Sequence, residues 1–309
     1  MALRVSVCIP TYNSAATLPA AIQSVLAQRL TDFELLISDN ASSDATADIV
    51  KRFRDPRIRY HRHSRNLGYT RNVRFCIEAS RAEVVGILCA DDYWEPDYLS
   101  SLLPSFEESP WVTLAYSACT ILDQTDSGRG DRFIPLIAER PTLSDGATYA
   151  LEEFRHGYTI LSGHLFRRSV ALATGSFADP TLRLLPDLLH RLRVAARGRV
   201  AYVPRPLAVY RVHPTNLSAG TRSYDWWREE LHVRRRMALD PRLRACRRGS
   251  LRESFRDVLL SLLCVHPDVA DSAERLRTLL RRRPTPWGCP EMLTKTSEPF
   301  PDIPPASGS

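Results

Sequence analysis

The sequence predicts an α/β fold: a mostly parallel sheet with flanking helices, followed by a helical C-terminal region. Three observations support this. Short β-rich runs alternate with segments of helical periodicity, polar residues follow the strands, and 44% of the 309 residues belong to the hydrophobic set. Such alternation is typical of parallel sheets whose right-handed crossovers cover both faces. The length allows one large domain with an appended region.

The first ninety residues repeat a strand–helix unit. Val5–Ile9 is a β-rich run that Pro10 ends, and residues 14–29 place apolar side chains at helical spacing. Further strands are predicted at Phe33–Ser38, Ile58–Tyr60 and Glu83–Leu88, and further helices at Ala45–Phe53 and Thr70–Ser80.

Beyond Pro96 the pattern loosens. Helices are predicted at Asp97–Glu108, Val170–Ala173 and Leu184–Ala196, a strand at Val112–Tyr116, a long irregular segment at 123–145, and edge strands at Val200–Val203 and Leu207–Tyr210. We therefore expect a sheet domain over residues 1–220, a helical region over 221–283, and a disordered, proline-rich tail over 284–309.

Composition excludes several classes of protein. No apolar run approaches the ~20 residues of a membrane-spanning helix, and the start lacks the apolar stretch of a secretory signal, so a cytoplasmic location is expected. The seven cysteines show no C-x-x-C spacing, which argues against a disulfide framework or a structural zinc site. The arginine-rich segment 222–283 is expected to be a solvated helix face, with weak peripheral membrane contact as the alternative. It lacks the aromatic interleaving of a nucleic-acid binder.

Polar residues at three strand ends form the candidate site, because an open parallel sheet binds its ligand beyond the carboxyl ends of its strands. Thr11 and Asn13 follow the first strand, Asp39 the second, and Asp91 and Asp92 the fourth. Neither a G-x-G-x-x-G nor a phosphate-binding G-x-x-x-x-G-K-[ST] motif is present. Two adjacent carboxylates can hold a divalent cation that bridges a diphosphate, although an isolated Asp-Asp is more often a turn or a helix cap.

Five segments, taken in order, resemble glycosyltransferase family 2. They are Val5-Ser-Val-Cys-Ile-Pro-Thr-Tyr-Asn13, Ser24-Val-Leu-Ala-Gln28, Glu34-Leu-Leu-Ile-Ser-Asp-Asn-Ala-Ser-Ser-Asp44, Asn66-Leu-Gly68 and Ala90-Asp-Asp-Tyr-Trp-Glu-Pro-Asp-Tyr-Leu99. The resemblance covers about residues 4–220. It implies the Rossmann-like GT-A fold and an inverting transfer of a sugar from a nucleotide-diphosphate sugar, UDP by default, to a saccharide or small-molecule acceptor.

The resemblance also implies roles for single residues. The nucleotide-sugar contacts it implies are Pro10, Thr11, Asn13, Asp39, Asn66, Asp91 and Arg211. A divalent metal, Mg²⁺ or Mn²⁺, is expected at Asp91, Asp92 and His213. Asp187, at the head of a helix, takes the place of the family's general base; its local alternative is a helix N-cap before Leu188.

Two positions depart from the family pattern. Cys89 stands at the first carboxylate of the D-x-D metal motif, and a thiol suits Mg²⁺ or Mn²⁺ poorly. Pro186 stands where a glutamate usually precedes the base. The Cys89 departure keeps open a catalytically degenerate binding or scaffold protein of the same fold. A nucleotidyltransferase is the other alternative, although the segment after the first strand is not a Gly- and Lys/Arg-rich loop.

Overall fold

The computed structural model describes residues 3–124, 132–133, 138–156, 160–179, 181–214, 216 and 223–240. The chain divides into two units, Met1–Ser254 and Phe255–Ser309, and all described residues belong to the first. The expected helices beyond residue 240 and the expected disordered tail lie outside the described residues. No helix in the described part of the chain is long and apolar enough to cross a membrane.

Over the first ninety residues the elements alternate as the sequence predicts, whereas the segment 123–145, predicted to be irregular, contains two short strands. The strands are β1 (Val5–Thr11), β2 (Phe33–Asp39), β3 (Ile58–Arg62), β4 (Val84–Ile87), β5 (Tyr93–Trp94), β6 (Val112–Asp123), β7 (Arg132–Phe133), β8 (Thr142–Asp145), β9 (His164–Arg167) and β10 (Arg199–Val212). The helices are α1 (Leu18–Leu26), α2 (Thr46–Arg52), α3 (Tyr69–Ala79), α4 (Tyr98–Leu102), α5 (Pro104–Glu108), α6 (Gly146–His156), the 3₁₀ turn η1 (Leu161–Gly163), α7 (Arg168–Ala173), α8 (Pro186–Ala195) and α9 (Ser223–Leu239).

One sheet holds all these strands in the order β3-β2-β1-β4-β9-β6-β10-β5, with β7 beside β6 and β8 beside β10. β1 pairs in parallel with β2 and β4, β2 with β3, and β6 with β10. β9 runs antiparallel to both β4 and β6. Because β9 is antiparallel to both of its neighbours, β6 runs in the same direction as β4. The strands β1–β4, β6 and β10 therefore all end at one edge of the sheet. This carboxyl edge is where a ligand is expected.

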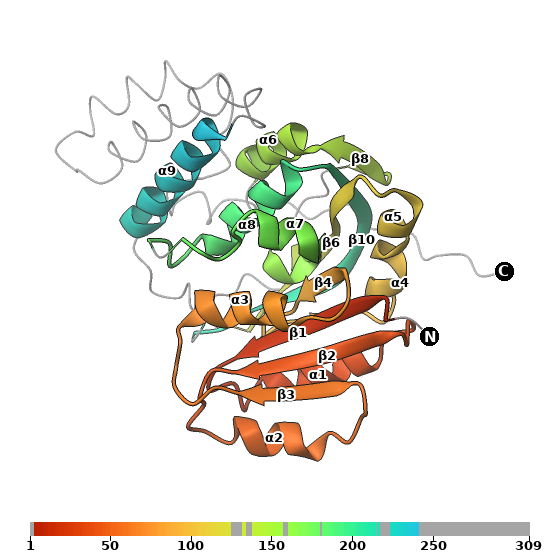
Figure 1. Ribbon diagram of the computed structural model, residues 1–309, viewed down its shortest axis with the longest axis vertical. Coiled ribbons are helices and arrows are strands. Elements are labelled where there is room, and N and C mark those ends of the chain that lie inside the picture. The colour runs from red at the N-terminus through yellow and green to blue at the C-terminus, as the bar shows by residue number, and fades with distance from the viewer. Residues whose placement is uncertain are drawn as a thin grey trace. The chain divides into compact units, whose positions relative to one another are not determined.

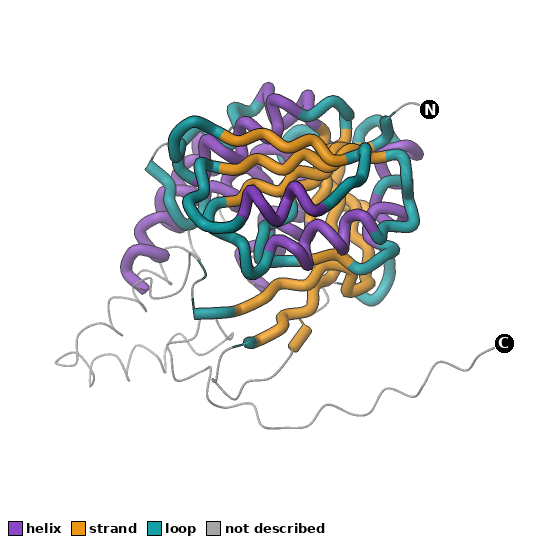
Figure 2. The backbone as a smooth tube through the Cα atoms, turned by 90° about the horizontal axis from the view of Figure 1, so that it is seen from below, coloured by secondary structure: helices purple, strands orange, loops and turns teal. Residues whose placement is uncertain are grey.

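Helices cover both faces of the sheet, as predicted (Figure 1). Alternate side chains of β1 show the division: Cys8 joins one buried cluster, and Val5, Val7 and Ile9 join the other. The first cluster takes side chains from α3, α6, α7, α8 and α9, and the second from α1, α2, α4 and α5. Figure 2 shows the strands β1–β3 between these helices.

The predicted helix Asp97–Glu108 is wrong as a single element. It forms two short helices, α4 and α5, which meet at Leu103. Pro104 is the cause, because proline has no N–H to donate and its ring clashes with the preceding helical turn. It therefore starts α5 rather than continuing α4.

The two predicted edge strands are one continuous strand. β10 spans fourteen residues from Arg199 to Val212 and lies between β6 on one side and β8 and β5 on the other. Its pairing with β6 shifts register between Val203 and Ala208, around Pro206. The irregularity explains why the sequence reads as two segments, and the continuity carries the chain to the carboxyl edge at Val212.

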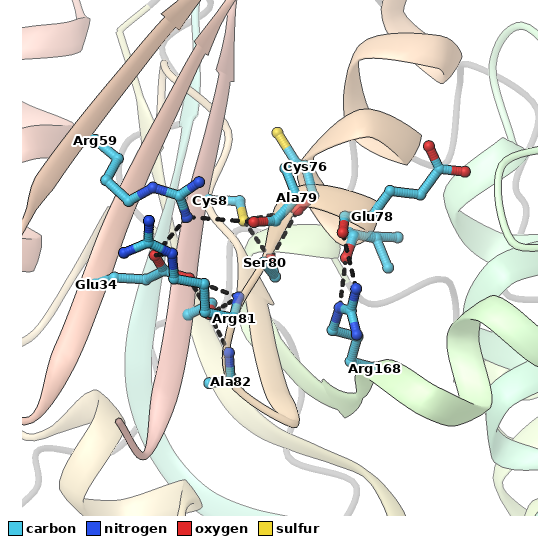
Figure 3. Close-up of polar contacts among 12 residues, drawn as sticks. Cys8, Glu34, Arg59, Cys76, Glu78, Ala79, Ser80, Arg81, Ala82 and Arg168 are labelled. Carbon is cyan, nitrogen blue, oxygen red and sulfur yellow. Dashed lines mark hydrogen bonds and ion pairs between the residues drawn. The ribbon is translucent and has the colours of Figure 1, made fainter. Parts of the chain in front are cut away.

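Two arginines donate hydrogen bonds to the C-terminal end of α3 (Figure 3). Arg168 donates to the carbonyl oxygens of Ile77 at 3.0 Å and Glu78 at 2.8 Å, and Arg59 donates to that of Ala79 at 3.2 Å. These carbonyls belong to the last helical turn, which has no intrahelical donors. The two arginine side chains therefore attach the C-terminal end of α3 to β3 and to the start of α7. The N-terminal end of α3 then lies at the carboxyl edge of the sheet.

Two buried histidines remain uncharged in the folded protein. Burial, followed by the charges of Arg191 and Arg193, lowers the pKa of His190 to about 3. Burial and the charge of Arg191 also hold the pKa of His164 well below its usual value. A histidine in the unfolded chain binds a proton near pH 6.5, so between about pH 3 and 6.5 the unfolded state binds more protons. Stability is therefore lost as the pH falls through this window.

We predict that His190→Gln flattens the pH dependence of stability. Removing one such histidine lowers the slope of the unfolding free energy against pH by up to about 1.4 kcal/mol per pH unit between pH 4 and 6. Urea unfolding across this range measures the slope. The exposed His61→Gln makes the same change outside the core and is the matched control. A His190→Gln slope equal to wild type would show that His190 titrates normally in the fold.

Candidate active site

The site begins where β4 leaves the sheet. β4 ends at Ile87, opposite Cys8, while β1 continues to Thr11 and there pairs with Asp39 of β2. The chain after β4 therefore turns away beside the end of β1. We call Cys89, Asp91 and Asp92, which follow, the acidic corner; one ligand atom from each lies within 4.8 Å of those of the others.

Asp92 holds the acidic corner together. Its side chain is buried, and its two oxygens accept hydrogen bonds from the Ser162 hydroxyl at 2.5 Å and the backbone N–H of Arg211 at 3.1 Å. Ser162 also accepts from the N–H of Cys89 at 3.0 Å. Burial, followed by the charge of Asp91, raises the pKa of Asp92 well above its usual value. Both carboxylate oxygens of this predicted metal ligand are thus engaged by protein donors.

Asp91 is the more accessible carboxylate, with 29% of its side chain exposed. Its Oδ2 accepts from the side-chain amide of Asn216 at 3.0 Å and lies 3.4 Å from Nε2 of His213. Among the described residues no group donates to Oδ1 of Asp91. A carboxylate and an imidazole at this separation suit a divalent ion such as Mn²⁺ or Mg²⁺. Asp91 and His213 therefore lie close together, and a metal ion between them stays a prediction.

Cys89 does not offer a thiolate. Burial, followed by the charges of Asp92 and Asp91, raises the pKa of its thiol well above the usual value. Because the thiolate is the form that binds metals, the thiol is a poor ligand beside these carboxylates. The departure from the family motif thus leaves Asp91 and His213 as the better-suited ligands.

Arg211 braces the corner from β10. Its Nε donates to the backbone carbonyl of Asp91, and its Nη2 donates to that of Thr17, ahead of α1, at 3.2 Å. The side chain is buried and lies over the ring of Tyr93, 5.8 Å from the centroid. Two of its donors are therefore used within the protein, and contact with a nucleotide sugar stays a prediction.

The predicted nucleoside contacts lie at the ends of β1 and β2. Asp39 is fully buried, and its oxygens accept from the N–H of Ser42 at 2.8 Å and the hydroxyl of Tyr60 at 2.6 Å. Thr11 is buried too, and its hydroxyl has no hydrogen-bond partner among the described residues. Pro10 lies just before Thr11 in β1, paired with β2. An unpartnered buried hydroxyl is costly, which suits a position that a ligand completes.

Asn13 and Asn66 shape the loops around these strand ends. Asn13 has a positive φ of 50°, a conformation that asparagine tolerates better than most residues. Its side-chain oxygen accepts from the N–H of Ser43 at 2.8 Å, and its own N–H donates to Ser42 at 2.9 Å. Asn66 accepts from the side-chain amide of Asn40 at 2.8 Å. Both predicted contacts therefore fix the loop after β2.

Asp187 is the second residue of α8, not its N-cap; Leu185 occupies that position. The local alternative of an N-cap is therefore wrong. Oδ2 of Asp187 accepts from Nη1 of Arg191 at 2.6 Å, and Nη2 of Arg191 lies 3.2 Å from Glu153. Arg191 and Glu153 are buried, whereas 23% of the Asp187 side chain is exposed. One oxygen of the predicted base is thus held by a buried cation.

Tyr69, the first residue of α3, connects the two parts of the site. Burial is the main cause that raises the pKa of its hydroxyl well above the usual value, and the charges of Asp187 and Asp91 add to it. Charges act this strongly only on near neighbours. Asp187 and Asp91 of the acidic corner therefore both act on this tyrosine, the first residue of α3.

The sequence reading missed four residues that shape the site: Tyr69, Ser162, Arg191 and Asn216. Asn216 had a signal, because it lies in the same segment as Arg211 and His213. The other three contribute through contacts between segments more than twenty residues apart or within a helix interior. Their residue types alone give no sign of this.

The comparisons with known proteins agree with this geometry. Glycosyl transferase family 2 matches residues 6–172. An uncharacterised protein of Mycobacterium tuberculosis is 31% identical over 215 residues, 67% of this chain and 66% of that protein. The succinoglycan biosynthesis protein ExoO of Rhizobium meliloti is 35% identical over 224 residues, 69% of this chain and 62% of its own length. The chain thus spans slightly less than two thirds of these relatives.

A solved structure shares the fold. Staphylococcus aureus TarS, residues 1–349 in complex with UDP-GlcNAc, aligns with a TM-score of 0.64 over 82% of this chain and 72% of that one, at 17% identity. The predicted GT-A sheet is thereby confirmed. The family match covers more than half of the chain and confirms the resemblance seen in the sequence: the chain belongs to glycosyl transferase family 2.

Proposed function

We propose that this chain is an inverting glycosyltransferase that moves a sugar from a nucleotide-diphosphate sugar to an acceptor hydroxyl with the help of a divalent metal. One observation carries the proposal: a candidate metal pair, Asp91 and His213, lies after the carboxyl ends of β4 and β10, and both Asp91 and the candidate base, Asp187, raise the pKa of Tyr69. Family membership supports glycosyl transfer.

In the proposed reaction, Asp187 accepts the proton of the acceptor hydroxyl as that oxygen attacks the anomeric carbon. Arg191 holds Oδ2 of Asp187, which leaves Oδ1 to take the proton. The attack and the departure of the diphosphate occur on opposite faces of the sugar, so the configuration inverts. Asp91 and His213 would hold Mg²⁺ or Mn²⁺, which when bound stabilises the negative charge on the departing diphosphate.

The donor that fits best is a UDP-sugar. TarS, which shares the fold, has been solved with UDP-GlcNAc and with UDP. The unpartnered hydroxyl of Thr11 and the loop held by Asn13 lie where the nucleoside of such a donor would bind. Pro10, Asp39, Asn66 and Arg211 complete the proposed pocket, with Asp39 and Asn66 shaping its walls.

The proposed acceptor is a saccharide or another small molecule with a free hydroxyl. ExoO, a relative at 35% identity, is named for succinoglycan biosynthesis, which supports a saccharide. A cytoplasmic location and weak contact with an anionic membrane surface remain part of the proposal. α9 exposes Arg228, Arg235 and Leu231, a mixture of charge and apolar surface that such contact would use.

A degenerate, non-catalytic member of the family is the second candidate. The observation that favours it is Cys89, whose protonated thiol replaces a carboxylate of the acidic corner. Asp92 also has both oxygens bound within the protein. A protein of this kind would bind the nucleotide without transferring a sugar.

We predict metal-dependent binding of a single nucleoside diphosphate. With Mn²⁺ present, one of UDP, GDP and dTDP raises the unfolding free energy, by about 2.7 kcal/mol at a hundredfold excess over Kd. Thermal shift measures the effect with and without metal. Asp91→Ala abolishes the metal-dependent part, whereas the exposed Asp48→Ala, which lies on α2, retains it. Absence of any shift would remove the donor site from the proposal.

We predict that Asp187→Asn lowers kcat at least a hundredfold, because general-base help is commonly worth that much. Donor binding by thermal shift stays near wild type, since the substitution leaves the nucleotide contacts intact. Asp225→Asn, an exposed aspartate in the first turn of α9, is the control and keeps wild-type turnover. Turnover by Asp187→Asn equal to wild type would exclude Asp187 as the base; nucleotide binding without turnover in wild type would favour the degenerate protein.

A further inference from the structure

A glutamate from α9 binds the backbone immediately ahead of α8. Glu229 is only 4% exposed, and its carboxylate accepts from three successive backbone N–H groups. These are Arg183 at 2.9 and 3.0 Å to the two oxygens, Leu184 at 2.7 Å and Leu185 at 3.0 Å. Successive N–H groups that converge in this way form a concave anion site, and here a side chain of the same chain fills it.

The position of this contact determines where Asp187 lies. α8 begins at Pro186, and its N-cap residue, Leu185, makes no side-chain cap. Leu185 instead donates its N–H to Glu229, two residues before Asp187. The start of α8 therefore has its local support from another helix rather than from its own sequence.

Three further contacts attach α9 and the residue that follows it to the segments around α8. Asp179, in the loop that leads to α8, lies 3.2 Å from His232 and 3.3 Å from Arg236. At the far end of α8, Arg197 pairs with Asp240 at 2.8 Å. α9 is thus bonded to the segments before and after α8.

One face of α9 is part of the hydrophobic core. Val233 and Met237, one and two turns beyond Glu229, are buried in the cluster that also holds Leu188 and Leu192 of α8. Glu229, Val233 and Met237 recur every four residues and so share one face of the helix. The apolar contacts determine the position of α9 on α8, and Glu229 determines the conformation of the backbone that precedes α8.

We propose that Glu229 is a positioning residue for Asp187, so that α9 belongs to the catalytic unit. This inference rests on the proposed role of Asp187 as the base. Glu229 is not proposed to contact the substrate. It holds the backbone of residues 183–185, and the position of this backbone sets the direction in which the Asp187 side chain projects from α8. Loss of its charge weakens three hydrogen bonds at once, because a neutral amide offers only one acceptor oxygen.

The test compares Glu229→Gln with Glu230→Gln. Glu230 is the next residue of the same helix and pairs with Arg234 at 2.6 Å, so the control makes the same chemical change away from α8. We expect Glu229→Gln to lower kcat at least tenfold while the Kd for the nucleotide stays within twofold. Amide exchange of residues 183–189 becomes faster. Glu230→Gln leaves kcat, Kd and this exchange near wild type.

The amide exchange needs no substrate, which separates this proposal from the proposed function. Unchanged exchange in Glu229→Gln overturns the positioning role, and so does faster exchange with wild-type kcat. A wild-type chain without turnover counts against the proposed function instead. Should Glu229→Gln fail to fold, Glu229→Asp keeps the charge on a shorter side chain. Faster exchange than in wild type and a kcat between those of wild type and Asp187→Asn are then expected, and wild-type values of both overturn the proposal.

Discussion

The buried carboxylate of Asp92 is the interaction on which the acidic corner depends. A buried carboxyl group costs free energy unless donors in the protein replace the water that it loses. Ser162 and the N–H of Arg211 supply them, and they come from segments 70 and 119 residues away. Satisfying one carboxylate therefore brings the ends of β4 and β10 and the turn η1 together. Asp91 and His213 meet because of this closure.

The candidate base, Asp187, is also held by a buried partner. Arg191 is buried between Glu153 and Asp187, and only Asp187 reaches solvent. Removing one partner of such a group leaves an uncompensated charge, which is why these groups hold their geometry firmly. The arrangement fixes one oxygen of Asp187 and presents the other. The hydrogen bonds of Asp92 and the ion pair between Asp187 and Arg191 thus position both halves of the site before any ligand binds.

Sequence reasoning succeeded where the signal was local. The apolar runs of β1, β2 and β4 end at Thr11, Asp39 and the acidic corner, and parallel pairing brings those ends to one edge. It failed at β9 and β5, which have four and two residues and little alternation. Pro104 is a helix breaker in the sequence, and the prediction of one helix over Asp97–Glu108 did not take it into account. Tyr69 and Arg191 could not be predicted, because their roles arise from contacts between elements.

Helix α9 shows that composition does not reveal which residues of a helix are buried. The arginine-rich segment reads as a solvated helix face, and for Arg228 and Arg235, which are exposed, that reading fits. Glu229 and Arg234 lie on the same helix but are buried, and a residue count gives all of them equal weight. A buried glutamate is tolerated only where donors await it, and here the donors are the backbone ahead of α8. The proposed support of Asp187 therefore extends beyond the sheet and its crossover helices to α9.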